Sequence, residues 1–262
     1  MVKTGVLDWV KGDDGVFRRQ WTRAEIRKTS ARRYQLYVDN GTGELVARGS
    51  AVTSVDKAKS QSLVMPLTLA ERCDLYKQAF PTWVAPWIDH NRINGMWMIG
   101  ADYRNKSKLY GAYPNGYLKR VESMVPDLMS GNVLHLFAGS LPPGDYIRVD
   151  AMRDDQRDPD VQCDAQALPA HWTGRFDLIF ADPPYSKEDA TEYGHPMPHR
   201  YTVIKECARV LKPGGWLIWL DTQWPMHAKV TLPLVGQIGL VRSTQHRVRL
   251  ISMFERTAAA AP

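Results

Sequence analysis

The chain has 262 residues, of which 44% are hydrophobic and 24% charged, a balance typical of folded globular proteins and not of disordered chains. No apolar run approaches the roughly 18 residues that a membrane-spanning helix needs, and the start of the chain carries no secretory signal. We therefore expect a cytoplasmic protein with no membrane partner. The three cysteines, Cys73, Cys163 and Cys207, are widely separated. Their number and spacing argue against a disulfide framework and a paired-cysteine zinc site, and we expect no metal.

The positive charge is concentrated near the start of the chain. Residues 1–60 hold 12 Lys or Arg against 7 Asp or Glu, which accounts for +5 of the formal net charge of +6. A basic cluster attracts polyanions such as nucleic acid, although a basic run is equally often a solvated surface. The candidate substrate-binding residues in this cluster are Arg27, Lys28, Arg32 and Arg33.

The first hundred residues predict a small region that mixes helices and strands. Trp21–Arg32 can form a short basic helix, and two alternating runs around Asn40–Gly43 predict a hairpin. Thr68–Phe80 has helical spacing, with Glu71 placed to complete a capping box at its start. The Trp-rich segment 81–100 has no clear assignment; it is either an aromatic core joining two parts of the protein or a platform for stacking bases.

From about residue 114 short apolar strands alternate with amphipathic helices. This pattern predicts an α/β fold with a mostly parallel, Rossmann-like sheet that is covered on both faces. The closing Lys212–Gly215 run is typical of a helix C-cap. Strands are expected at 133–139, 146–152, 176–184, 215–222 and 246–256, and helices at 115–124, 201–211 and within 226–240.

Polar residues follow several of these strands, at the edge where open parallel sheets bind their ligands. Gly139 follows the first strand and lets the backbone approach a ligand closely. Asp150 ends the second strand, where a carboxylate can hold a ribose diol. Asp164 lies where a further strand could end and can accept a hydrogen bond from an adenine amino group.

The strongest signal is the tetrapeptide Asp182-Pro183-Pro184-Tyr185 at the end of the strand FDLIFADPP. An exocyclic amine of a nucleobase is a poor nucleophile. An enzyme that methylates it therefore needs groups that accept hydrogen bonds from the amine. The Asp182 carboxylate and the Pro183 carbonyl can accept them, and two consecutive prolines hold these groups rigidly. Tyr185 offers a flat face for a base taken out of the stack. The simpler interpretation is that the two prolines only end a strand.

Residues 131–256 resemble class I S-adenosylmethionine-dependent methyltransferases, specifically the nucleic-acid amino-methyltransferases with a (D/N/S)PP(Y/F/W) motif. The resemblance implies S-adenosyl-L-methionine as cofactor, with its methionine part at FAGS, its ribose at Asp150 and its adenine beside Asp164. It implies that the motif binds the target amine. The implied cofactor-binding residues are Phe137, Ala138, Gly139, Ser140, Asp150, Asp164 and Ala165, and the implied catalytic residues are Asp182, Pro183, Pro184 and Tyr185.

Two departures from the family pattern shape the expected architecture. Only Ser140–Asp145 separate the first glycine from the next strand, so we expect a loop in place of the first crossover helix. The cofactor and catalytic motifs leave no room between them for a recognition domain. We therefore expect residues 1–100 to be a basic substrate-binding region, 101–257 the methyltransferase domain and 258–262 a tail. Gly100–Pro114 is expected to be a flap over the cofactor, as the resemblance implies for the segment before the first strand, with a purely structural connector as the alternative.

The sequence therefore predicts a DNA-binding enzyme that methylates an exocyclic amine, with adenine N6 as the first candidate. The same chemistry on an RNA base (guanine or adenine) and methylation of cytosine N4 in DNA are alternatives. A nucleic-acid-binding protein of this fold that has lost catalysis is a further alternative, supported by the shortened glycine loop. The oligomeric state does not follow from the sequence.

Overall fold

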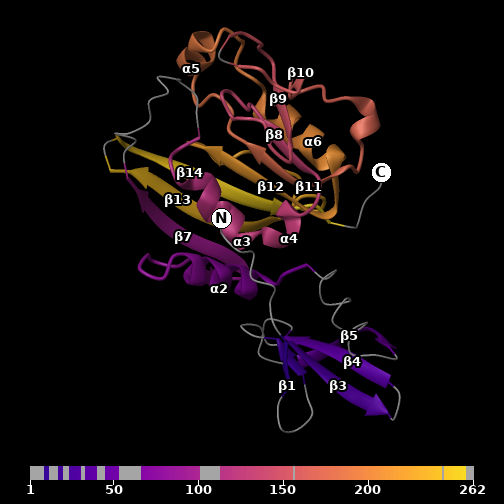
Figure 1. The fold of residues 1–262 in the computed structure, drawn as a ribbon. Coiled ribbons are helices and arrows are strands. Elements are labelled where there is room, and N and C mark those ends of the chain that lie inside the picture. Colours follow the sequence, from indigo (N-terminus) through magenta and orange to yellow (C-terminus); the bar gives the residue numbers. More distant parts are fainter. Residues whose placement is uncertain are drawn as a thin grey trace. The chain divides into compact units, whose positions relative to one another are not determined.

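The structure is a computed structural model, and its described residues fall into two compact units, Met1–Asp74 and Leu75–Pro262, which Figure 1 draws as a ribbon. In the strands before residue 66 only the backbone is described. The described residues are 9–11, 17–19, 24–30, 33–39, 45–52, 66–100, 113–155, 157–243 and 245–257.

The first unit contains a sheet of five antiparallel strands that follow one another in chain order. Its last two strands form the expected hairpin, because Asp39 pairs with Leu45 on the two sides of the Asn40–Gly43 turn sequence. The strands are β1 (Trp9–Lys11), β2 (Phe17–Arg19), β3 (Ala24–Ser30), β4 (Arg33–Asp39) and β5 (Leu45–Val52).

The helix predicted over Trp21–Arg32 is wrong, because β3 occupies most of this segment. Pairing with the neighbouring hairpin strand outweighs a weak helix propensity, since β3 is hydrogen-bonded along its length to β4. Arg27 pairs with Gln35 and Lys28 with Tyr34. Consecutive strand positions belong to opposite faces of a sheet, so Arg27 and Lys28 do not share one face. Arg33 begins β4, and Arg32 lies outside the described residues.

The second unit is built on a nine-stranded, mostly parallel sheet of order β10-β9-β8-β11-β12-β14-β13-β7-β6. The expected α/β, Rossmann-like class is confirmed, and every strand expected after residue 130 is present. β14 runs antiparallel to both β12 and β13, while β8 runs parallel to β9 on one side and β11 on the other. The strands are β6 (Trp87–Asp89), β7 (Arg92–Ile99), β8 (Val133–Leu136), β9 (Ile147–Asp150), β10 (Val161–Gln162), β11 (Phe176–Ala181), β12 (Leu211–Asp221), β13 (Leu234–Arg242) and β14 (Gln245–Glu255).

The Trp-rich segment extends this sheet, so the sheet begins before the boundary expected at residue 100. β7 pairs in parallel with β13, and β6 forms the edge. Trp97 is buried and stacks on Tyr76 of helix α2 (Leu69–Ala79), with ring centroids 5.2 Å apart. Trp83 and Trp87 are exposed. At the start of α2 the backbone N–H of Thr68 donates to Glu71 (2.8 Å), which confirms the expected capping box.

Two expectations near the end of the chain are wrong. No helix forms within 226–240, because residues from Leu234 onward belong to β13. Glycine is a poor helix residue, and a Cβ at Gly236 would lie 3.0 Å from the Cβ of Ile93, so this position suits a tightly packed strand. Lys212–Gly215 does not cap a helix, because β12 starts at Leu211, directly after helix α6 (Arg200–Val210). The pairing of β12 with β11 shifts register across Lys212–Gly215.

The helices pack on the sheet around two groups of buried side chains. Leu134 and Leu136 of β8 face α6, whose Val203 and Cys207 belong to the same apolar core. His135, between them in sequence, points to the other face, where Tyr113 contacts it and stacks on Tyr117 of α3. The remaining helices of this unit are α3 (Tyr117–Met124), α4 (Pro126–Met129), the short η1 (Ala170–Trp172), α5 (Lys187–Glu192) and α6 (Arg200–Val210).

Candidate active site

The sequence-predicted site residues of the second unit lie at one edge of its sheet. β8, β9, β10 and β11 are parallel, so their carboxyl ends meet at the same edge. From β8 the chain continues to β9 on one side of it, whereas β11, later in the chain, lies on its other side. The strand order therefore reverses between β8 and β11, and open sheets bind ligands at such a switch point. Phe137–Ser140 follow β8, Asp150 ends β9, and Asp182 follows β11.

The loop after β8 is tied to Asp150. Phe137 and Gly139 both have positive φ angles, of 57° and 52°, and turn the chain sharply after the strand. The backbone N–H of Gly139 donates to Asp150 Oδ2 (2.9 Å), and that of Met152 donates to Asp150 Oδ1 (3.0 Å). Ala138 is buried, and Ser140 is half-buried. The Asp150 carboxylate is therefore held in one orientation at the sheet edge.

The crossover from β8 to β9 contains no helix, as the sequence predicts. Buried Arg148 of β9 fixes it instead: its Nη1 donates to the Leu141 carbonyl (3.0 Å), and its Nη2 lies 2.8 Å from Asp160 Oδ1. The Tyr146 hydroxyl donates to the Pro142 carbonyl (2.6 Å). A partly buried ion pair and a tyrosine thus hold this loop in place of a crossover helix.

Asp164 and Ala165 follow β10, at the same edge. The Asp164 carboxylate accepts from the backbone N–H of Gln166 (2.9 Å) and from its side-chain amide (3.0 Å). The Gln166 Oε1 in turn accepts the backbone N–H of His199, the residue before α6 (2.8 Å). Ala165 is buried in the core. Asp164 is thus connected through Gln166 to the start of α6.

The Asp182–Tyr185 motif forms a closed pair in this structure. The Tyr185 hydroxyl donates to Asp182 Oδ1 (2.7 Å). Burial raises the pKa of Asp182 from 3.8 to about 7, and the charge of Asp221 adds to this rise, while the Tyr185 hydrogen bond and the charge of Arg249 oppose it. Near neutral pH this carboxyl group therefore exists in both protonation states.

Arg200 anchors the motif, a role that the sequence did not indicate. Its Nε lies 2.6 Å from Asp221 Oδ2, and Asp221, the last residue of β12, is fully buried. The Arg200 Nη2 also donates to the Tyr185 carbonyl (3.1 Å) and to the Pro184 carbonyl (3.4 Å). One guanidinium thus joins the motif backbone, the start of α6 and the end of β12.

Arg249 of β14 is a second residue that the sequence did not indicate. It is 8% exposed, and its guanidinium carbon lies 5.2 Å from the centroid of the Tyr185 ring. Arg247, two residues earlier, lies 5.9 Å from the same centroid, but its side chain is 52% exposed and faces Asp189 at 3.7 Å. The sequence signal was weak, because Arg249 is one of two arginines that alternate with apolar residues in the first half of β14.

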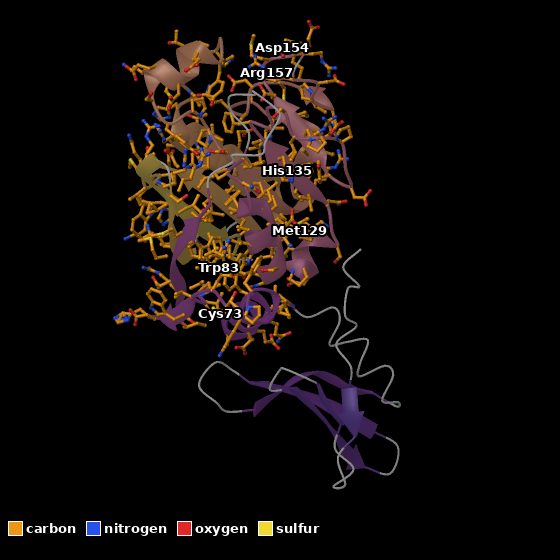
Figure 2. The ribbon with its side chains drawn as sticks, turned by 60° about the vertical axis from the view of Figure 1, so that its left-hand side comes forward. Cys73, Trp83, Met129, His135, Asp154 and Arg157 are labelled. Atoms are coloured by element: carbon orange, nitrogen blue, oxygen red, sulfur yellow. The ribbon has the colours of Figure 1, made fainter. Side chains whose placement is uncertain are left out.

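Aromatic side chains form a layer against the face of the sheet opposite α6. His135, labelled in Figure 2, stacks on Phe180 with ring centroids 4.7 Å apart and meets the Tyr113 hydroxyl at 3.2 Å. Burial lowers the pKa of His135 to about 3, so its ring is neutral and serves packing. The flap expected over Gly100–Pro114 falls mostly on residues 101–112, outside the described residues.

Within the described ranges, no group of three or more His, Cys, Asp or Glu side chains could hold a metal ion. In the same residues no helix is long and apolar enough to cross a membrane.

No model of a known protein family matches the chain, and no curated protein matches it. Several solved methyltransferase structures are similar to about half of it. The antibiotic-resistance methyltransferase Kmr is 16% identical, covering 50% of this chain and 89% of its own, with a TM-score of 0.33. TrmN from Thermus thermophilus is 16% identical (48% and 44% covered, TM-score 0.34). The N-methyltransferase NodS from Bradyrhizobium japonicum WM9, in complex with S-adenosyl-L-homocysteine, is 16% identical (48% and 78% covered, TM-score 0.32).

Proposed function

We propose that this protein is an S-adenosyl-L-methionine-dependent methyltransferase that acts on an exocyclic amine of a DNA base, with adenine N6 as the target. The observation that carries the proposal is the position of Asp182 and Tyr185. A carboxylate, a rigid Pro-Pro backbone and an aromatic ring follow a central parallel strand at the switch point of the sheet. These are the acceptors and the flat surface that a flipped amino base requires.

The residues at the ends of β8, β9 and β10 fit this cofactor. An ionised carboxylate has about four acceptor sites, so Asp150 can accept the two ribose hydroxyls in addition to its two backbone bonds. Asp164 can accept from the adenine amino group, with Ala165 beside it, and Phe137–Ser140 line the methionine part. When bound, the cofactor supplies an electrophilic methyl group on a sulfonium sulfur.

In the proposed reaction, the motif binds and orients the amine. Asp182 and the Pro183 carbonyl accept hydrogen bonds from its N–H groups, which stabilises the positive charge that develops on nitrogen. The Tyr185 hydroxyl occupies Asp182 Oδ1 in this structure, so it gives up or shares that bond when the base enters. Its ring then stacks on the base, and correct positioning provides much of the rate.

The proposal is tested by incubating the protein with labelled cofactor and with duplex DNA and RNA in separate reactions. Mass spectrometry of the digested nucleosides identifies the product, and N6-methyl-2′-deoxyadenosine is expected. N4-methyl-2′-deoxycytidine would change the target base, and label in RNA alone would change the nucleic acid. Cofactor binding by calorimetry without transfer to either nucleic acid would favour the non-catalytic binding protein.

The basic N-terminal cluster is proposed to contact DNA phosphates. In wild type, log affinity for duplex DNA should fall with log salt concentration by about 0.9 for each phosphate contacted. Neutralising Arg27, Lys28, Arg32 and Arg33 together should flatten this slope by about 2–4 and weaken all sequences alike. Cofactor affinity, measured by calorimetry, should not change. An unaltered salt slope would show that the cluster is a solvated surface.

A further inference from the structure

Arg249 is a buried cation with two unused hydrogen-bond donors. Only 8% of the residue is exposed, and within the described parts of the chain neither its Nε nor its Nη1 has a hydrogen-bond partner. Burying donors without partners costs free energy, and more so when they carry charge. Such a group needs an explanation, and a bound ligand that accepts its hydrogen bonds is one.

Two other arginines of this unit show how the fold treats buried guanidinium groups elsewhere. Arg148 is paired with Asp160 and a backbone carbonyl, and Arg200 with Asp221 and two carbonyls. Arg249 differs from both, because its Nε and Nη1 have no hydrogen-bond partner in the described residues, although its guanidinium interacts with the Tyr185 hydroxyl and with the charge of Asp182. Its missing partner is therefore best sought in the molecule that the site binds.

The position of Arg249 places its donors beside the motif. The next residue, Leu250, pairs with Asp221 at the end of β12, so Arg249 lies at the same sheet edge as Asp182. Its guanidinium lies against the ring of Tyr185, whose hydroxyl is bonded to Asp182. The hydroxyl of Tyr117 is also buried without a partner, and burial together with the Asp182 charge raises its pKa. More than one unpaired polar group thus surrounds Asp182.

We propose that Arg249 donates a hydrogen bond to the ring nitrogen adjacent to the amine that Asp182 binds. This inference rests on the proposed function and adds a residue that determines which base is accepted. In adenine and cytosine the carbon that carries the amine also carries an unprotonated ring nitrogen, N1 or N3 respectively. A carboxylate acceptor beside a guanidinium donor matches this amine-and-nitrogen edge.

The charges around Arg249 favour a neutral acceptor over a phosphate. Asp182 and Asp221 already place two carboxylates near this edge, and Arg200 is bonded to Asp221. A phosphate bound to Arg249 would add a further negative group beside Asp182 and oppose its ionisation. A ring nitrogen satisfies the guanidinium without adding charge. The Watson–Crick edge of guanine presents an N1–H donor next to its amine. This donor would face the donor nitrogens of Arg249 and could not form a hydrogen bond with them.

The test compares one oligonucleotide with an adenine and the same oligonucleotide with 1-deazaadenine, in which a C–H replaces N1. Wild type and Arg249→Met are assayed for kcat/KM at pH 9, where Asp182 is ionised. Wild type should prefer adenine by about 10- to 150-fold, the value of a hydrogen bond from a charged donor. In Arg249→Met this preference should fall to a few-fold. The substitution should lower kcat/KM for adenine, whereas kcat/KM for 1-deazaadenine, which lacks the acceptor, should stay at its wild-type value. If the nucleoside product proves to be methylcytosine, 3-deazacytosine replaces 1-deazaadenine.

Arg247→Met is the matched control, since Arg247 lies on the same strand and near the same ring but is exposed. It should retain the wild-type preference. Thermal unfolding and calorimetric cofactor binding should show that Arg249→Met is folded and still binds the cofactor, so that a lost preference is not a result of unfolding.

Equal losses on both substrates in Arg249→Met would show that Arg249 acts only through its charge and would overturn the inference. A guanine N2 product from wild type would overturn the assignment of Arg249 to the Watson–Crick edge, where guanine carries N1–H, while leaving amine methylation intact. Absence of transfer to any base amine by wild type would instead refute the proposed function.

Discussion

Asp182→Ala is expected to reduce methyl transfer by at least about 100- to 1,000-fold while cofactor affinity stays within a few-fold of wild type. In the proposed function the carboxylate serves the target amine and not the cofactor, so its loss removes an acceptor of transition-state charge. The Tyr185 hydroxyl also loses its bond to Oδ1 (2.7 Å). Single-turnover rates and calorimetric cofactor titration separate these effects. Near-normal turnover in this variant would refute the assignment of the motif.

Asp182→Asn is the conservative companion variant, because it keeps an acceptor oxygen without the charge. Burial raises the pKa of Asp182 to about 7, so the carboxyl group is neutral below this pH and charged above it. Since the ionised form is the better acceptor, the wild-type transfer rate should rise with pH through about 7. Asp182→Asn should be slower and should lack this rise. A wild-type rate that falls over the same range would contradict the acceptor role.

The strands of the sheet were predictable because their sequences are continuous apolar runs. Val133–Leu136 and Leu178–Ala181 are buried on both faces of a parallel sheet, where nearly every position is apolar. His135 is the exception and has aromatic neighbours. The helixless crossover was predictable from length alone, since Ser140–Asp145 are too few to form a helix and return along the sheet. The candidate residues at the strand ends followed from the same strand assignments.

The errors have a common cause in long-range pairing. Trp21–Arg32 and Met226–Leu240 both carry weak helical patterns, but the first pairs with β4 and the second supplies β13, which lies between β14 and β7. β-structure depends on partners distant in sequence, which a local pattern does not contain. The Trp-rich segment was undecided for the same reason, because β7 pairs with β13, well over a hundred residues later.

The roles of Arg200 and Arg249 could not be recognised in the sequence for a related reason. Arg200 is recognisable only from its bonds to Asp221 and to the motif carbonyls, and Arg249 only from its two unpaired donor nitrogens beside Tyr185. Neither relation follows from spacing along the chain. A sequence motif identifies the groups proposed to contact the substrate. The residues that hold those groups in place come from distant elements, so the motif does not identify them.

Asp221→Ala is expected to destabilise the protein by about 3–5 kcal/mol, since it leaves the Arg200 guanidinium largely buried without its charged partner. It also removes the acceptor of the Trp219 indole N–H (3.3 Å) and of the Thr222 backbone N–H (2.6 Å). Denaturant unfolding measures this loss, and Arg200→Met should show a comparable one because it leaves the Asp221 charge buried.

The double variant Arg200→Met/Asp221→Leu separates stability from positioning of the motif. Replacing both charges with apolar side chains should recover part of the stability, because no unpaired ion remains buried. Methyl transfer should not recover with it, since nothing then binds the Pro184 and Tyr185 carbonyls, which lie 3.4 and 3.1 Å from Arg200 Nη2. Cofactor affinity should match wild type, because Asp150 and Asp164 are untouched. Recovery of transfer together with stability would show that the ion pair serves folding alone, and that the two prolines hold the motif without Arg200.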